Sequence, residues 1–204
     1  AGTWNGTLTF QGEGSSNQVE TMGGPIIFNG KITGPGGFEK IGSNVNYAFE
    51  ISNPDNDWQG ETRISAGTLK IAGEGKFSPT SFLYMGGSTA RFDGANTAQT
   101  IGGLSGDGTI TNVNLTINQP ANDFPEYFVG VITGASSAVT KGGAGALSLL
   151  AQSTYEGATI VQQGTLEISG SISGSASITL QNDGTLRLAG ESSTNRIKDT
   201  AGIT

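Results

Sequence analysis

The sequence predicts an all-β protein that winds as a β-solenoid, in which short strands of successive coils stack on one another. Three observations support this fold class. Glycine makes up 34 of the 204 residues, about twice its usual share of roughly 7%. The apolar residues come in short alternating pairs between glycine-rich turns, and one long segment occurs about twice. A long self-similar period in such a sequence is typical of a solenoid or repeat array.

Residues 1–27 form the first unit, which we expect to be an N-terminal coil or cap. Leu8 and Phe10 alternate onto one face of a strand at 7–10, because successive side chains of a strand point to opposite sides. A polar loop follows, and an apolar run at 26–28 begins the next strand.

The repeated segment predicts two modules, at roughly 28–101 and 128–204, with linker coils at 102–127 between them. Phe49-Glu-Ile51 matches Leu147-Ser-Leu149, and Gly67 matches Gly164 at an offset of 97 positions. The offset drifts by single residues along the chain, and such length changes belong in surface loops. We therefore predict one solenoid domain over residues 1–204.

Each coil is expected to contribute only a few inward side chains. The predicted inward pairs are Phe49/Ile51, Leu69/Ile71, Phe82/Tyr84, Ala90/Phe92, Leu147/Leu149, Leu166/Ile168, Ile178/Leu180 and Leu186/Leu188. Strands this short need neighbours stacked above and below them, and coils of roughly 20-odd residues give about nine coils. The longest strand candidate is 110–117, and 95–101 is expected to form a single turn of helix at most.

A tandem of two β-sandwiches is the alternative fold, because a repeat near a hundred residues fits the length of a sandwich domain. The small number of apolar residues and the frequent glycines favour the solenoid instead, since sandwich strands are longer and bury a thicker core.

Charge and composition exclude several classes of partner. The formal net charge is −7, which argues against nucleic acid and against anionic membrane surfaces. The sequence has no apolar run of membrane-spanning length, so we expect no membrane insertion by this segment. Cysteine is absent, and stability is therefore expected to come from repeated packing rather than from disulfides.

The sequence lacks the residues that most enzymes use, and we predict a protein that is not an enzyme. Histidine and cysteine are absent, so the commonest general base, metal ligand and thiol nucleophile are missing. We assign no catalytic, cofactor-binding or metal-binding residue and expect no cofactor. Asp55 and Asp57 resemble the start of a calcium loop, but Ala66 stands where that loop needs a glutamate, so a turn is the preferred interpretation.

Two groups of aromatic residues are candidates for contact with a partner. A proline-bounded loop holds Asp123, Phe124, Glu126 and Tyr127 and is the candidate partner-facing loop; the alternative is a loop that tucks Phe124 and Phe128 against the solenoid. Trp58 and Tyr155 occupy matching positions, where they are expected to close a corner of the core, with exposed stacking on a sugar as the alternative.

The segment 140–169, TKGGAGALSLLAQSTYEGATIVQQGTLEIS, resembles the autotransporter-associated β-strand repeat, also called the passenger-associated transport repeat. The matching residues are Lys141, Gly143, Gly145, Leu147, Leu149, Tyr155, Gly157, Thr159, Gly164 and Leu166, with Ser153 in place of the usual asparagine. A degenerate earlier copy contains Lys40, Gly42, Asn56, Trp58, Gly60, Thr62, Gly67 and Leu69.

The resemblance implies a right-handed parallel β-helix in the secreted passenger of a bacterial surface protein. The implied role is a stalk, an adhesive surface or an aid to export, located outside the cell or on its surface. We also expect self-association, because the ends of a solenoid have unpaired strand edges. The expected partners are a second copy of the chain or a host or matrix surface, with a glycan as a further candidate. Two alternatives stay open: a subunit of an extracellular filament, and a polysaccharide-binding or polysaccharide-processing β-helix that uses acids such as Asp55, Asp57 or Asp93.

Overall fold

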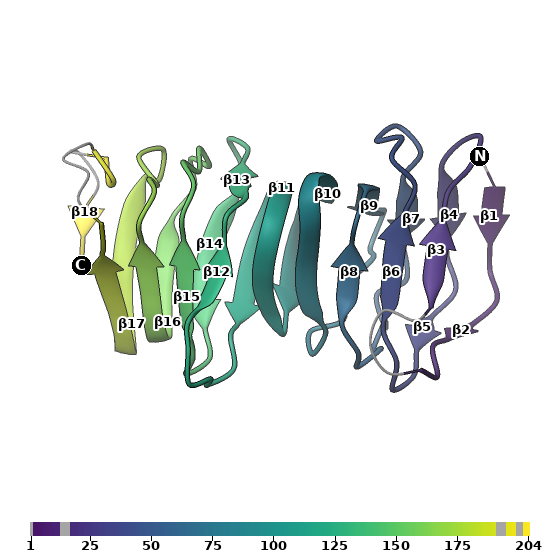
Figure 1. The fold of residues 1–204 in the computed structure, drawn as a ribbon, viewed down its shortest axis with the longest axis horizontal. Coiled ribbons are helices and arrows are strands. Elements are labelled where there is room, and N and C mark those ends of the chain that lie inside the picture. Colours follow the sequence, from purple (N-terminus) through teal and green to yellow (C-terminus); the bar gives the residue numbers. More distant parts are fainter. Residues whose placement is uncertain (1, 13–16, 191–194, 199–201) are drawn as a thin grey trace.

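The computed structural model describes residues 2–12, 17–190, 195–198 and 202–204. The chain winds as a β-solenoid of about nine turns, with the N-terminal strands at one end of the long axis and the C-terminal strands at the other (Figure 1). All strand pairs of the described residues are parallel. The solenoid prediction is therefore confirmed, and the alternative of tandem β-sandwiches is wrong.

The strands stack in three columns that run along the solenoid axis, here called faces 1, 2 and 3. Face 1 contains β1 (Gly2–Trp4), β4 (Ile26–Phe28), β7 (Phe49–Ile51), β9 (Gly67–Ile71), residues 90–93 of β10 (Phe82–Ile101), residues 109–111 of β11 (Gly103–Asn118), and β13 (Val131–Thr133).

Face 2 contains β3 (Gln18–Glu20), β6 (Phe38–Ile41), β8 (Thr62–Ile64), the starts of β10 and β11, β12 (Glu126–Phe128), β15 (Ala146–Leu149), and the ends of β16 (Thr159–Ile168) and β17 (Ser177–Leu188). Face 3 contains β2 (Leu8–Thr9) and β5 (Ile32–Thr33), the ends of β10 and β11, β14 (Ala138–Gly142), the starts of β16 and β17, and β18 (Gly202–Ile203).

β10 and β11 are long because each bends through all three faces without a break in pairing. Their register shifts between Gly86 and Arg91 and again between Asp93 and Thr97, which marks the two corners. Ala95 and Asn96 have φ values of 51° and 61° at the second corner. Residues 95–101 contain no turn of helix, because Thr97 onward pairs with β11 as a strand.

The core is a set of inward side chains that stack from coil to coil. In the first half an aromatic row runs through Phe10, Phe38, Trp58, Phe77 and Phe92, with consecutive ring centroids 5.0 to 5.6 Å apart. Such contacts add to the free energy gained from burial alone. In the second half the inward positions are mainly leucine, isoleucine and valine.

Most predicted inward pairs are buried, but one pair is out of register. Leu83 and Met85 point inward, rather than Phe82 and Tyr84. Leu83 lies between Thr62 and Leu104 in the face 2 ladder, and this pairing fixes which side chains face the core. Farther along the chain, Leu180 and Leu188 in β17 are partly exposed.

The described residues contain no helix of sufficient length and apolar character to cross a membrane.

Candidate functional site

Trp58 closes a corner of the core and is fully buried. Its Nε1 donates a hydrogen bond to Thr62 Oγ1 at 2.8 Å, and that hydroxyl lies 2.9 Å from Ser81 Oγ in the next coil. Ser81 in turn donates to the carbonyl of Gly60 at 2.7 Å. The buried polar side-chain atoms of Trp58, Thr62 and Ser81 are thereby all hydrogen-bonded, as a buried polar group requires.

Tyr155 repeats this arrangement in the second copy. Its hydroxyl lies 2.7 Å from Thr159 Oγ1, which lies 2.8 Å from Ser175 Oγ. Ser175 donates to the carbonyl of Gly157 at 3.0 Å, and burial raises the pKa of Tyr155 above its ordinary value. Because both aromatic residues are buried, neither can stack on a sugar at the surface; they tie consecutive coils together.

Lys141, which the repeat motif includes, lies near the end of β14 and is fully buried. Its Nζ donates to the carbonyls of Gly142, Gly143 and Gln163 at 2.7, 2.8 and 3.1 Å. Burial lowers the pKa of Lys141 to about 8. Lys40 is buried in the same way, donates to the carbonyl of the following residue, and also has a pKa lowered by burial.

Gly67 begins β9 and Gly164 lies at the corner within β16, with φ values of 77° and 67°. A Cβ atom at either position would lie 2.4 Å from a carbonyl oxygen of the preceding coil, that of Gly42 or Gly145. Both features require glycine. The other predicted motif residues lie in the buried ladders or in the turns between them: Gly60, Leu69, Gly143, Gly145, Gly157 and Leu166.

Matching strands of the two repeats lie on different faces of the solenoid. The ladder that contains Phe49 runs along face 1 and reaches 131–133 in the second half. The ladder that contains Leu147 runs along face 2 and leads back to 62–64. Matching residues of the repeats therefore face different directions and cannot form one continuous binding surface.

The candidate partner-facing loop lies before and within β12 on face 2. Asp123, Phe124 and Tyr127 are exposed and Glu126 is half-buried, with its carboxylate accepting a hydrogen bond from Asn122. Phe124 is 79% exposed, so it does not tuck against the solenoid, whereas Phe128 is buried in the core. The loop therefore presents an aromatic side chain to the surroundings.

The acids named as alternatives do not form a common site. Asp57 pairs with Lys31 at 2.6 Å, and hydrogen bonds from Lys31 and Thr33 lower the pKa of this carboxyl group. Asp55 lines a hollow of about 440 Å³ and Asp57 a different one of about 330 Å³, while Asp93 accepts a hydrogen bond from the backbone of a corner. Within the described residues, no three or more acidic side chains are placed to hold a metal ion.

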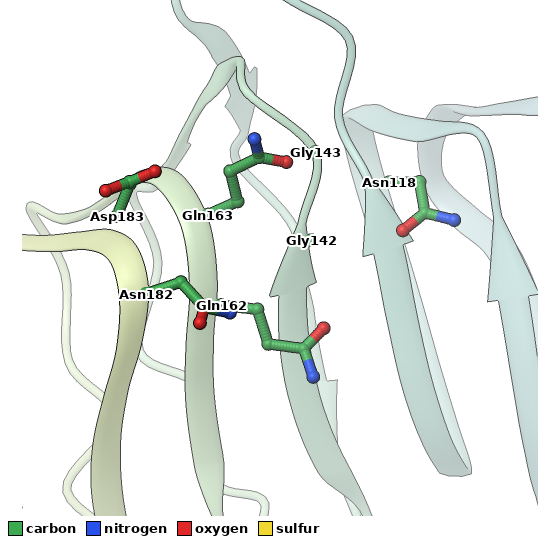
Figure 2. A pocket seen from close by; sticks show the side chains of 7 residues that line it. All are labelled: Asn118, Gly142, Gly143, Gln162, Gln163, Asn182 and Asp183. Atoms are coloured by element: carbon green, nitrogen blue, oxygen red, sulfur yellow. The ribbon is translucent and has the colours of Figure 1, made fainter.

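A polar hollow of about 520 Å³ lies where faces 3 and 2 meet in four consecutive coils (Figure 2). It is lined by Asn118, Gly142, Gly143, Gln162, Gln163, Asn182 and Asp183. Sequence reasoning did not find this hollow because its residues are spread over more than sixty positions. The available signal was the amide or acidic residue at the end of the face 3 strand in three of the four coils, with two glycines in the remaining coil. This pattern becomes visible only when the coil register is known.

Comparison with known proteins gives two matches. The Passenger-associated-transport-repeat family matches residues 49–71 and 139–168. The adhesin BmaC autotransporter of Brucella suis biovar 1 (strain 1330) is 28% identical over 166 residues, which cover 78% of this chain and 5% of that protein. The chain thus spans about one-twentieth of the length of the relative. No solved structure is significantly similar.

The matched segments coincide with the structural repeat. Residues 49–71 begin with β7 and end with β9, and residues 139–168 extend from β14 to the end of β16. The repeat and the similarity to an autotransporter adhesin indicate a secreted, cell-surface location. The resemblance noted in the sequence is thus confirmed: two segments of the β-solenoid match the passenger-associated transport repeat.

Proposed function

We propose that this chain is a non-catalytic segment of the passenger of a bacterial surface protein, in which the solenoid holds an adhesive surface away from the cell. The observation that carries the proposal is a group of exposed apolar side chains in and beside β12 and directly after β15, here called the apolar patch: Phe124, Tyr127, Val129 and Leu150. Exposed apolar patches that are clustered, rather than scattered singly, mark interaction surfaces.

The apolar patch is held in place by the strand ladder. Leu149 pairs with Phe128, and the backbone N–H of Leu150 donates to the carbonyl of Phe128 at 3.0 Å. Val129 and Leu150 consequently lie beside each other in adjacent coils, about 4.8 Å apart along the axis. Ordered backbone beneath the patch reduces the entropy that a partner must overcome on binding.

The name of the Brucella relative supports an adhesive role for the whole protein, and the partner we propose is a host or matrix surface with apolar binding pockets. A non-catalytic role is supported by the surroundings of the acids, because Asp57 is paired with Lys31 and Asp55 lines a different hollow from Asp57, whereas a glycosidase directs two carboxyl groups into one site. A screen for degradation of polysaccharides should therefore show no activity.

The test is adhesion of cells or beads that display this chain to immobilised host-matrix proteins. Phe124→Ser combined with Tyr127→Ser is expected to reduce adhesion several-fold. The matched control is Met22→Ser, because Met22 is equally exposed, at 78%, but lies far from the apolar patch. Unchanged adhesion of the double variant would refute the proposed surface.

Self-association is the competing use of the apolar patch. Light scattering over a range of concentrations separates the two, because a dimer formed through the patch would dissociate in the Phe124→Ser and Tyr127→Ser variant. Electron microscopy of the same material distinguishes such a dimer from a filament, in which chains join end to end.

A further inference from the structure

We propose that the polar hollow between faces 3 and 2 is a binding groove for an uncharged oligosaccharide. This inference rests on the proposed surface role, because a surface adhesin meets glycans on cells and matrix, and it names a second site with a ligand class of its own. The apolar patch and the polar hollow have no residue in common.

The shape of the hollow follows from the stacking of coils. Asn118 ends β11, Gly142 ends β14 and Gly143 follows it, and the other lining residues come from corners within β16 and β17. Four successive coils at about 4.8 Å spacing give a groove about 14 Å long. That length accommodates a short oligosaccharide rather than a single sugar.

The floor of the hollow is bare backbone. A Cβ at Gly142 would lie 2.6 Å from Asn118 Oδ1, and one at Gly143, where φ is 71°, would lie 2.3 Å from a backbone oxygen. Figure 2 shows Asn118 on one side of the two glycines and Gln163 on the other, while the side chain of Gln162 extends toward the strand that carries Gly142. A flat ligand can therefore approach the chain closely at this point.

The rim carries amide groups that the protein does not use. Among the hydrogen bonds of the described residues, none involves the side chain of Asn118, Gln162, Gln163, Asn182 or Asp183. A β-bulge helps to present them, because two residues of β17 oppose the single residue Gln162. Asn182 takes the unusual φ of 47° there, and bulges commonly re-aim side chains at functional positions.

The chemistry of this rim favours sugar hydroxyls over ions. Each amide offers both donors and acceptors, and a carboxylate accepts two hydrogen bonds side by side, which matches neighbouring hydroxyl groups. A cation would find a single carboxylate, that of Asp183, and the carbonyl oxygens of Gly142, Gly143 and Gln163 lie against the positive Lys141 ammonium group. An anion would be repelled by the carboxylate of Asp183. It would find no free donor on Lys141, because the ammonium group of Lys141 already donates to three carbonyl oxygens.

The experiment titrates the 204-residue chain with chito-, cello- and manno-oligosaccharides and, as an anionic comparison, with heparin fragments. Side-chain amide signals in nitrogen–proton correlation spectra report where each probe binds. We expect a neutral oligosaccharide to shift the amide signals of Asn118, Gln162 and Gln163 at millimolar concentration.

Two variants test the assignment. Gln163→Ala and Asp183→Asn are each expected to weaken binding by about five- to thirty-fold, the effect of losing one or two hydrogen bonds. Gln152→Ala is the matched control, because Gln152 is exposed at a different corner. This variant should bind the oligosaccharide with the same affinity as the parent chain. All three positions are exposed, so circular dichroism should show intact folding.

Three results would overturn the inference: no neutral oligosaccharide shifts the rim amides, both variants bind like the parent chain, or heparin alone binds. Failure here is distinguishable from failure of the adhesive role, because adhesion through the apolar patch is measured with the Phe124 and Tyr127 substitutions, which leave the polar hollow intact.

Discussion

Trp58 and Tyr155 hold the same place in the two repeats, and each bonds to the hydroxyl of a threonine four residues later, at 2.8 and 2.7 Å. They nevertheless lie over different faces: Trp58 packs beside Phe77 on face 3, whereas Thr154, the neighbour of Tyr155, donates from its backbone to Ile132 on face 1. The repeat offset of 97 positions is not a whole number of coils. Matching residues therefore keep the same local packing but lie on different faces of the solenoid.

The first prediction concerns the Tyr155 hydroxyl. Tyr155→Phe should lower the free energy of unfolding by about 1–2 kcal/mol, because the substitution removes a buried hydrogen bond and keeps the ring. Tyr127→Phe is the control, since Tyr127 is 51% exposed and its hydroxyl can bond to water instead. Urea unfolding of both variants provides the measurement, and equal effects at the two positions would contradict the buried chain of hydroxyls.

The second prediction is a rise in stability with pH that depends on Lys141. Its pKa is about 8 in the folded protein and about 10.4 in an unfolded chain. Between these values the unfolded state binds more protons, so the free energy of unfolding increases with pH, by at most about 1.4 kcal/mol per pH unit. The lowered pKa of Lys40 acts in the same direction.

Urea unfolding at about pH 7.5 and about pH 9.5 tests this, with an expected gain on the order of 2 kcal/mol. Lys141→Met should remove most of the rise, while Lys70→Met, a substitution of a partly exposed lysine, should leave it in place. A stability that is flat or falls over this range in the parent chain would show that Lys141 keeps an ordinary pKa.

The third prediction separates backbone strain from collision with the neighbouring coil. Gly73 and Gly164 both have positive φ, at 53° and 67°, but a Cβ at Gly73 would meet nothing within 4 Å. Gly73→Ala should cost about 1 kcal/mol for the backbone conformation alone. Gly164→Ala should cost about 1–3 kcal/mol more, because the methyl group overlaps the Gly145 carbonyl oxygen. Similar denaturation midpoints for the two variants would refute the close stacking of coils.

The inward-facing residues could be predicted from the sequence where apolar and polar residues alternate strictly. Leu147/Leu149 and Leu166/Ile168 are buried as expected, because only one phase of a period-two pattern places them inside. Four consecutive apolar residues at 82–85 satisfy either phase, and there the pairing of Leu83 with Leu104 decides which side chains face the core. No local pattern contains that information.

The candidate sites also differ in whether the sequence alone predicts them. The proline-bounded loop with Phe124 was visible because it interrupts a regular pattern, and its exposure follows from the loop being outside the ladder. The polar hollow was not visible because Asn118 and Asp183 become neighbours only through the register of four coils. The burial of Lys141 was not predicted, since the carbonyl groups that accept hydrogen bonds from its ammonium group belong to the turns around it.

The fourth prediction contrasts two phenylalanines of one short segment. Phe128→Ser should lower the free energy of unfolding by about 3–5 kcal/mol, because Phe128 is fully buried and its loss leaves a cavity and an unpaired hydroxyl. Phe124→Ser should change stability by less than about 0.5 kcal/mol, since its ring is 79% exposed. If thermal unfolding shows this contrast, a loss of adhesion in the Phe124 variant reports a lost contact with the partner rather than a damaged solenoid. If Phe124→Ser also destabilises the fold, Phe124 packs against the solenoid wall and the proposed adhesive surface loses its aromatic anchor.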